Sequence, residues 1–399
     1  MTPRPSASYA RRARAGLAAL LGGVLVAVAA TPASADAVRD RQWALTVLRA
    51  EEAWGVTRGE GVTVALLDTG ADGTHPDLTG RVLPGKDLVG FGASPGDKTW
   101  ARHGTAMAGI IAGHGHGPDR RDGVMGIAPA AKILPVRVIL EEGDPARGQA
   151  REKKGGALAE GIRWAADHGA DVINLSLGDD SASAHHEAAE DEAVQYALAK
   201  GVVVVASAGN SGRKGHPVSY PAAYPGVIAV TAIDRKGQRA GFSTRNWYAS
   251  VSAPGQDIVI ADPDRKYYPG GWGTSAAAAY VSGTVALIRA KYPKLSPSQV
   301  KRLLEDTASD RPRGGRDDSR GRGLVDPVLA LQKAERWKPE PVLPAAAAHQ
   351  SRYFGSGPEP ERPGARGHGL LAGVAAGGGL ALLAAAAVLA RRRRGPATG

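Results

Sequence analysis

Short apolar segments alternate with longer helical segments through the middle of this chain, and this alternation constrains the fold more than any other feature. Runs such as Val202–Ala206 have no polar face, which is typical of strands buried on both faces of a parallel sheet. The predicted strands are 62–67, 133–139, 172–175, 202–206 and 227–232, and the predicted helices are 104–112, 157–168, 187–200, 275–291 and 297–307. We therefore expect an α/β fold, in which a doubly wound, mostly parallel sheet carries helices on both faces.

The first 35 residues have the three parts of a secretory signal peptide. Four arginines and no acidic residue lie at the start, and an uncharged run follows from Ala15 to Ala30. Ala33-Ser34-Ala35 then provides the small-x-small pattern that a signal peptidase accepts. The sequence therefore predicts that residues 1–35 are removed near Asp36.

The C-terminal end predicts a membrane anchor. Gly369–Ala390 is a 22-residue stretch without a charge, followed at once by Arg391–Arg394. At about 1.5 Å per residue, this stretch spans a hydrocarbon core of about 30 Å as a C-terminal transmembrane helix. The positive-inside rule keeps the tail, residues 391–399, in the cytoplasm. We expect a single-pass plasma-membrane protein with an extracytoplasmic body, residues 36–337, on a Pro/Ala/Gly-rich stalk, residues 338–368.

Charge and cysteine content exclude several classes of function. The net charge is +11, but eight arginines at the two ends of the chain account for most of it. The body is nearly neutral, so nucleic-acid binding loses its main support. The chain has no cysteine, which excludes disulfides, a thiolate zinc site and a cysteine nucleophile. No loop of clustered carboxylates stands out, and we assign no metal ligands and no cofactor.

Three motifs place an acid, a histidine and a serine beside glycine. Asp68-Thr69-Gly70 directly follows the strand 62–67, His103 precedes a helix that begins with small residues, and Gly273-Thr274-Ser275 opens another helix. Each has an ordinary structural alternative: a turn aspartate, a surface histidine and a helix N-cap serine. In a doubly wound sheet, however, functional groups gather at the carboxyl ends of the strands.

A fourth motif, Ala208-Gly209-Asn210, follows strand 202–206 and supplies an amide side chain, although a simple turn explains it equally well. Asp68-Thr69-Gly70 also matches the catalytic tripeptide of aspartic proteases. Those enzymes need two carboxylates that share a proton, and no second Asp-Thr/Ser-Gly occurs here. The remaining histidines of interest are interpreted as structural or surface residues in polar or Gly-rich loops: His114, His116, His185, His186 and His216.

Together, the order Asp, His, Ser and the asparagine after Ala-Gly resemble the subtilisin-like serine proteases, or subtilases. The resemblance covers about residues 42–332 and implies a subtilisin-like domain with a short N-terminal extension. The signal peptide, the opening Arg41-Gln42-Trp43 and the anchor with its terminal arginines resemble the mycosins. Mycosins are membrane-anchored proteases associated with type VII secretion in actinobacteria.

The resemblance implies a role for each motif. Ser275 would be the nucleophile, His103 the general base, and Asp68 the group that orients His103. Asn210 would donate to the oxyanion together with the backbone N–H of Ser275.

The resemblance also implies a substrate-binding strand at Ser176, Leu177 and Gly178, with Tyr220-Pro221-Ala222 at the edge of the pocket. The chain departs from the subtilase pattern after the serine, where Ala276 and Ala279 replace a bulky residue and a proline. Because alanine is the best helix former, we expect the helix to persist.

These features imply a membrane-anchored extracytoplasmic serine endopeptidase that hydrolyses exported polypeptides through an acyl-enzyme. Type VII secretion membrane components would be its partners. The alternative is a protease-shaped scaffold that stabilises a secretion complex, with cleavage secondary. Two charged segments, 141–154 and 311–322, are predicted to be solvated loops, with docking of a secretion partner as the lesser alternative.

Overall fold

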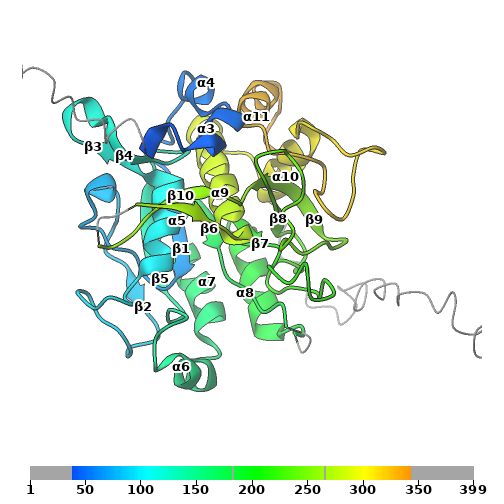
Figure 1. Cartoon of the computed structure of the whole chain (residues 1–399). Helices are drawn as coiled ribbons and strands as arrows, with labels where there is room; N and C mark the ends of the chain where they lie inside the picture. The colour runs from blue at the N-terminus through cyan, green and yellow to red at the C-terminus, as the bar shows by residue number, and fades with distance from the viewer. Residues whose placement is uncertain (1–37, 182–183, 265–266, 343–399) are drawn as a thin grey trace, which may run out of the picture. The chain divides into compact units, whose positions relative to one another are not determined.

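A seven-stranded parallel sheet forms the centre of the fold (Figure 1). The computed structural model describes residues 38–342, except 182–183 and 265–266. The strand order is β2-β5-β1-β6-β7-β8-β9, and every neighbouring pair is parallel. The strands of the sheet are β1 (Thr63–Asp68), β2 (Lys86–Asp87), β5 (Lys132–Arg137), β6 (Val172–Leu175), β7 (Val203–Ser207), β8 (Ile228–Ile233) and β9 (Ala249–Pro254). Two small antiparallel pairs join β3 (His114–His116) to β4 (Asp122–Met125), and β10 (Ile258–Ala261) to β11 (Tyr267–Gly271).

Helices cover both faces of this sheet (Figure 1). They are α3 (Trp43–Val47), α4 (Ala50–Trp54), α5 (Arg102–Ala112), α6 (Arg147–Lys153), α7 (Ala157–Asp167), α8 (Ala188–Ala199), α9 (Thr274–Lys291), α10 (Pro297–Thr307) and α11 (Pro327–Ala334). Apolar residues of α5 and α9 pack against one face, and those of α7 and α8 pack against the other. The predicted doubly wound α/β fold is confirmed.

Successive residues of β1 show why the strands lack a polar face. Val64 and Leu66 enter the core shared with α5 and α9, whereas Ala65 and Leu67 enter the core shared with α7 and α8. All four side chains are fully buried. Complete burial of one leucine side chain contributes about 1.5–3 kcal/mol. A polar residue at either register position of β1 would therefore disturb one of the two cores.

All five predicted strands and all five predicted helices are present, with ends within about two residues of those expected. The helix after Ser275 persists through Ala276 and Ala279, as predicted. Strand β9 was not predicted because its buried residues include Ser250 and Ser252, which interrupt any apolar run.

The N-terminal extension is part of the folded domain. The side-chain amide of Gln42 bonds to both the carbonyl and the N–H of Met125, at 2.8 and 3.0 Å. Trp54 Nε1 donates to the carbonyl of Ile127 at 2.8 Å. Residues 42–54 are thereby attached to the last residue of β4 and to the segment that follows it.

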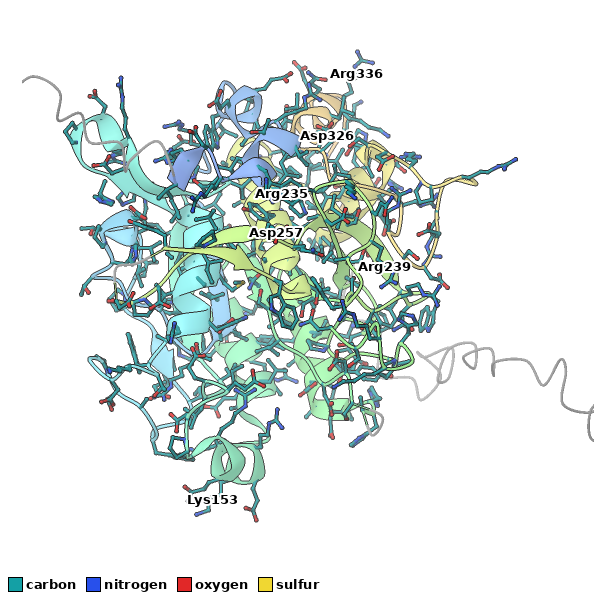
Figure 2. The ribbon with its side chains drawn as sticks, in the orientation of Figure 1. Lys153, Arg235, Arg239, Asp257, Asp326 and Arg336 are labelled. Atoms are coloured by element: carbon teal, nitrogen blue, oxygen red, sulfur yellow. The ribbon has the colours of Figure 1, made fainter. Side chains whose placement is uncertain are left out.

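Both charged segments are largely solvent-exposed, as the sequence predicts, although the first contains a helix and each has a part that packs against the domain. In the first, α6 forms the outer part, where Lys153 is exposed (Figure 2), but Glu141 turns inward toward β1. In the second, the N–H of Arg322 donates to the carbonyl of Ser250 at 2.8 Å. Gly321 approaches so closely that a Cβ there would lie 2.3 Å from the same oxygen. The end of the second segment, residues 321–322, is therefore packed against β9, whereas most of its other residues are exposed or half-buried.

No helix within the described part of the chain is long and apolar enough to cross a membrane. The predicted signal peptide, residues 1–35, and the predicted anchor and tail, residues 369–399, lie outside the described residues. Of the predicted stalk, only residues 338–342 are described.

Candidate active site

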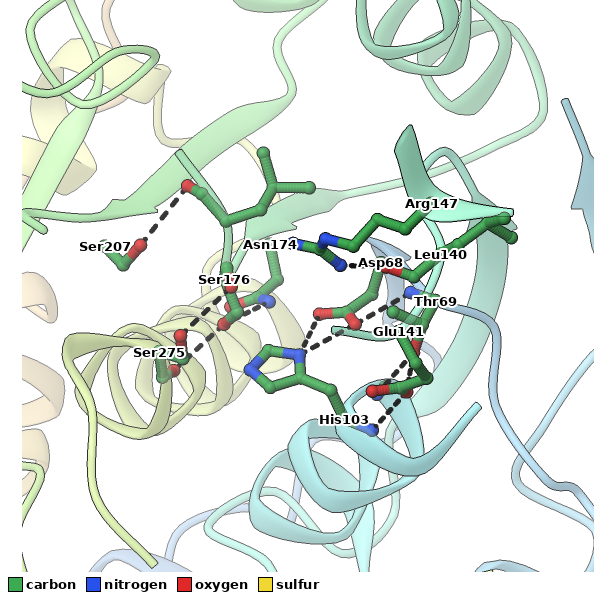
Figure 3. A network of polar contacts seen from close by, with 12 residues as sticks. Asp68, Thr69, His103, Leu140, Glu141, Arg147, Asn174, Ser176, Ser207 and Ser275 are labelled. Atoms are coloured by element: carbon green, nitrogen blue, oxygen red, sulfur yellow. Dashed lines mark hydrogen bonds and ion pairs between the residues drawn. The ribbon is translucent and has the colours of Figure 1, made fainter. Parts of the chain in front are cut away.

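Asp68 and His103 form the closest charged contact of the site (Figure 3). Asp68 is the last residue of β1 and is fully buried. Both of its carboxylate oxygens lie within hydrogen-bond distance of His103 Nδ1, at 2.8 and 2.9 Å. An ionised carboxylate can only accept a hydrogen bond, so Nδ1 carries the proton and donates it. The other ring nitrogen, Nε2, is consequently left as a base.

A close approach of helix α5 to strand β1 places His103 beside Asp68. The helix begins at Arg102, two residues before the predicted start, so His103 lies within its first turn, at the N-terminal end where the sequence places it. A Cβ on Gly104 would lie 1.8 Å from the carbonyl oxygen of Gly70 and 3.4 Å from Asp68 Cβ. Only glycine at this position allows the helix to start this near the end of the strand.

The surroundings of His103 stabilise its protonated form. Its side chain is about one-third exposed, at 35%. Desolvation on its own would lower the pKa of His103, but the carboxylates of Asp68 and Glu141 outweigh it and raise that pKa above its ordinary value. The imidazolium that forms when His103 accepts a proton is therefore favoured by two nearby negative charges.

Ser275 lies at the start of α9, on the opposite side of His103 from Asp68 (Figure 3). Its hydroxyl donates to the carbonyl of Ser176 at 3.0 Å, and the hydroxyl of Ser176 donates to the carbonyl of Ser275 at 2.9 Å. This reciprocal pair fixes the serine against the end of β6. A rotation about the Cα–Cβ bond of Ser275 would turn its hydroxyl toward the imidazole, and such contacts often tighten only when substrate binds.

Asn210 and the N-terminus of α9 together present two hydrogen-bond donors. Asn210 Oδ1 accepts from the N–H and the hydroxyl of Thr274, at 2.9 and 3.0 Å, which leaves its Nδ2 group as a donor. A Cβ on Gly273 would lie 3.8 Å from Asn210 Nδ2 and 3.6 Å from Ser275 N. Both donors therefore border the same small space, which is suited to a negatively charged oxygen.

The predicted substrate-binding segment, Ser176, Leu177 and Gly178, continues from the end of β6 beside Ser275. Ser176 is buried, Leu177 is half-buried and Gly178 is exposed. The next residue, Asp179, pairs with Tyr220 through two backbone hydrogen bonds of 2.9 and 3.2 Å. The structure thus brings the predicted pocket edge, which includes the cis Tyr220–Pro221 bond, next to this segment.

Two residues of the site, Glu141 and Asn174, were not predicted. Glu141 Oε1 accepts from the Thr69 hydroxyl at 2.6 Å and from the backbone N–H of His103 at 2.7 Å. Buried Asn174 donates to the Ser176 hydroxyl at 2.9 Å and accepts from that of Ser282 at 2.8 Å, so it links β6 to α9. An asparagine inside an otherwise apolar strand was the available signal for Asn174. Glu141 lies in a charged segment, and nothing in its local sequence indicated a role in the site.

The arrangement does not support an aspartic protease. Asp68 faces an imidazole, and the neighbouring carboxylate of Glu141 contacts Thr69 and a backbone amide. Asp68 therefore does not share a proton with a second carboxylate, as the mechanism of an aspartic protease requires. Within the described residues, no group of three or more His, Cys, Asp and Glu side chains could hold a metal ion.

The other histidines have structural or surface contacts, although His114 and His116 lie in strand β3 and not in a loop. His114 contacts the carbonyls of Gly115 and Thr79, and His116 Nδ1 lies 2.7 Å from Asp77 Oδ1. The predicted loop was wrong because the hairpin is short and Gly-rich. His185 Nε2 lies 2.8 Å from Glu187 Oε1 at the surface, and Nδ1 of half-buried His216 accepts from the backbone N–H of Arg245 at 3.2 Å.

Solved structures with the same fold include several of one protein, MycP1. MycP1 with its N-terminal propeptide removed is 32% identical, with a TM-score of 0.63, and the match covers 76% of this chain and 99% of that one. MycP1 from Mycobacterium smegmatis is 31% identical, with a TM-score of 0.64 and coverages of 77% and 88%. Another MycP1 structure, 33% identical with a TM-score of 0.63, is described as a serine protease and an essential component of the type VII (ESX-1) secretion system, with coverages of 77% and 91%.

Curated relatives are proteases as well. Fervidolysin from Fervidobacterium pennivorans is 40% identical over 71% of this chain, which spans 42% of the length of fervidolysin. Subtilisin DY from Bacillus licheniformis is 38% identical over 69% of this chain and 92% of that protein. The model of the subtilase family matches residues 59–323, which include Asp68, His103 and Ser275. The chain therefore belongs to the subtilase family of serine proteases, with mycosin structures among its structural neighbours.

Proposed function

We propose that this chain is a membrane-anchored, extracytoplasmic serine endopeptidase that cleaves exported polypeptides by an acyl-enzyme mechanism and works with a type VII secretion system. The observation that carries the catalytic part is the contact of both Asp68 oxygens with His103 Nδ1. This contact leaves Nε2 as a base on the side of Ser275 (Figure 3).

In the first half of the reaction, Ser275 Oγ attacks the scissile carbonyl and its proton passes to His103 Nε2. The electrons of the carbonyl move onto its oxygen, which receives hydrogen bonds from Asn210 Nδ2 and the backbone N–H of Ser275. The tetrahedral intermediate then collapses, the C–N bond breaks, and His103 gives the proton to the leaving amine.

In the second half, a water molecule attacks the ester carbonyl of the acyl-enzyme and gives a proton to His103. The same two donors stabilise the second oxyanion. Collapse of this intermediate releases the new carboxyl terminus and returns the proton to Ser275 Oγ. Asp68 holds the imidazole orientation and balances the positive charge of His103 throughout.

Membrane attachment is proposed from the sequence of residues 369–394, in which an uncharged stretch precedes four arginines. Export is proposed from the signal-like segment, residues 1–35. The secretion link is proposed from the similarity to MycP1, which is described as an essential component of such a system. A role as a scaffold with secondary cleavage remains the competing proposal, and it is also compatible with MycP1 being an essential component of a secretion system.

The first experiment treats the full-length chain and its Ser275→Ala variant with a fluorophosphonate probe and follows intact mass. We expect a single adduct on the wild type and none on the variant, because only an activated serine attacks the probe. A folded wild type without an adduct would contradict the proposal and favour the scaffold.

A second arm compares cells that carry either form. If Ser275→Ala abolishes processing of exported proteins but leaves secretion intact, cleavage and assembly are separate roles. Fractionation then tests the anchor, since the chain should leave the membrane fraction when residues 369–394 are deleted.

A further inference from the structure

Glu141 is tied to the catalytic histidine through its backbone. The carboxylate follows strand β5, 38 positions along the chain from His103. Its Oε1 atom accepts from the backbone N–H of His103 at 2.7 Å and from the Thr69 hydroxyl at 2.6 Å. Thr69 Oγ1 in turn accepts from the backbone N–H of Gly104 at 3.1 Å. Glu141 and Thr69 together satisfy two of the free amides in the first turn of α5.

Helix α5 lacks a cap of its own. The residue before it, Ala101, has a left-handed backbone with φ of 55° and no side-chain hydrogen bond to the helix. The first turn of α5 contains no acidic residue. The positive end of the helix dipole is therefore compensated by a carboxylate from another part of the chain. This matters for catalysis because His103 lies in that turn and must become positively charged during the reaction.

We propose that Glu141 is a positioning residue of this enzyme, which holds the main chain of His103 in place and whose negative charge stabilises the imidazolium formed when His103 takes the proton of Ser275. The assignment rests on the proposed role of His103 as the general base. Glu141 touches neither the substrate nor the reacting atoms, and it acts only through His103. Two different carboxylates thus serve the histidine, Asp68 at the ring and Glu141 at the backbone.

Charged groups from three elements face His103. Asp68 comes from β1 and Glu141 follows β5, and both favour the protonated ring. Arg147, the first residue of α6, opposes them. The Arg147 guanidinium donates to the carbonyl of Leu140, directly before Glu141, and so it holds the segment that carries the carboxylate. The protonation of His103 therefore depends on charged groups in residues 141–147, a segment that is distant from His103 in sequence.

The test compares Glu141→Gln with Glu142→Gln in the full-length chain. Glutamine keeps the size of residue 141 and an oxygen that can accept from His103 N, but it removes the charge. Residue 142 is exposed and provides a matched loss of charge one position away. Two readouts are used: kcat/KM against pH on a peptide substrate, and titration of the His103 ring by NMR in ¹³C-histidine-labelled protein that also carries Ser275→Ala.

We expect Glu141→Gln to move both the acidic limb of kcat/KM and the NMR titration of His103 to lower pH, and to lower the plateau of kcat/KM about 10-fold. Glu142→Gln should leave both unchanged. Glu141→Asp keeps the charge but has a shorter side chain. In this variant His103 should titrate as in the wild type, while the plateau of kcat/KM falls. These three results together separate the effect of the Glu141 charge from that of its hydrogen bond to the backbone N–H of His103.

Identical titrations for Glu141→Gln and Glu142→Gln would overturn the inference. So would a lower plateau that comes with a lower Tm and no shift in titration, because Glu141 would then be a structural cap only. The NMR arm needs no turnover. If the wild type neither reacts with the probe nor hydrolyses peptide, the proposed function fails, and the effect of Glu141 on His103 is still measured.

Discussion

Thr274 offers a sharp test of how the oxyanion donors are held. Its side chain is fully buried, and its hydroxyl donates to Asn210 Oδ1 at 3.0 Å while accepting from the N–H of Gly209 at 3.2 Å. Thr274→Val keeps the shape of the side chain but removes both hydrogen bonds. The side-chain oxygen of Asn210, Oδ1, would then accept only from the backbone N–H of Thr274, at 2.9 Å.

The expected cost follows from these contacts. Each lost hydrogen bond contributes about 1 kcal/mol, and the buried N–H of Gly209 is left without its partner, so the total loss is about 2–3 kcal/mol. For a domain of this size, that loss lowers Tm by about 3–5 °C. Because one hydrogen bond to Asn210 remains, kcat should fall about 10-fold, less than the 10²–10³-fold typical of losing a donor entirely.

The assay combines thermal unfolding with steady-state kinetics on a chromogenic peptide. Thr274→Ser is the matched control, since it keeps the hydroxyl and loses only a methyl group. Equal kcat and equal Tm for the valine and serine variants would refute the reasoning, because the hydroxyl would then support neither the loop nor Asn210.

Three further outcomes are expected. Asn210→Ala should lower kcat about 10²–10³-fold with little change in KM, and a loss below threefold would remove Asn210 from the oxyanion site. Because His103 must be neutral to act as a base and its pKa is raised, kcat/KM should fall with decreasing pH through a pKa above 6.5; a midpoint at or below 6.5 would contradict this sign. Gly283→Ala should destabilise the protein by about 1–3 kcal/mol, since its Cβ would lie 1.9 Å from Ile127 Cγ2, whereas Gly148→Ala on exposed α6 meets nothing within 4 Å and should be neutral or stabilising in the same denaturation assay.

The sequence alone predicts the parts of the fold in which burial requires apolar residues. A strand covered on both faces is mostly apolar, so Val203–Ser207 is visible in the sequence because it begins with a run of valines. Strand β9 uses buried serines, which local patterns do not distinguish from a loop. The order β5-β1-β6-β7 is a tertiary property that no single segment encodes. The sheet could therefore be predicted as a class, but its order could not.

The same distinction applies to the site. Asp68, His103, Ser275 and Asn210 each lie in a local motif with glycine, because a tight turn or a close helix approach requires one nearby. Glu141 has no such requirement, since a long flexible side chain can reach His103 from an ordinary loop. A supporting residue of this kind becomes visible only when the strands are placed side by side.

The strand order explains why the groups that stabilise the positive imidazolium and those that stabilise the negative oxyanion lie in separate parts of the site. Strands β5, β1, β6 and β7 are neighbours and parallel, so the segments after them bring Glu141, Asp68, Ser176 and Asn210 to a single edge of the sheet. The two carboxylates arrive from β5 and β1, beside the N-terminus of α5. The neutral donors arrive from β7, beside the N-terminus of α9. The proton therefore moves toward the two carboxylates beside His103, while the oxyanion forms where Asn210 Nδ2 and the backbone N–H of Ser275 can donate to it. Because Ser275 stands between them, the polarity needed for acyl transfer is already present before a substrate binds.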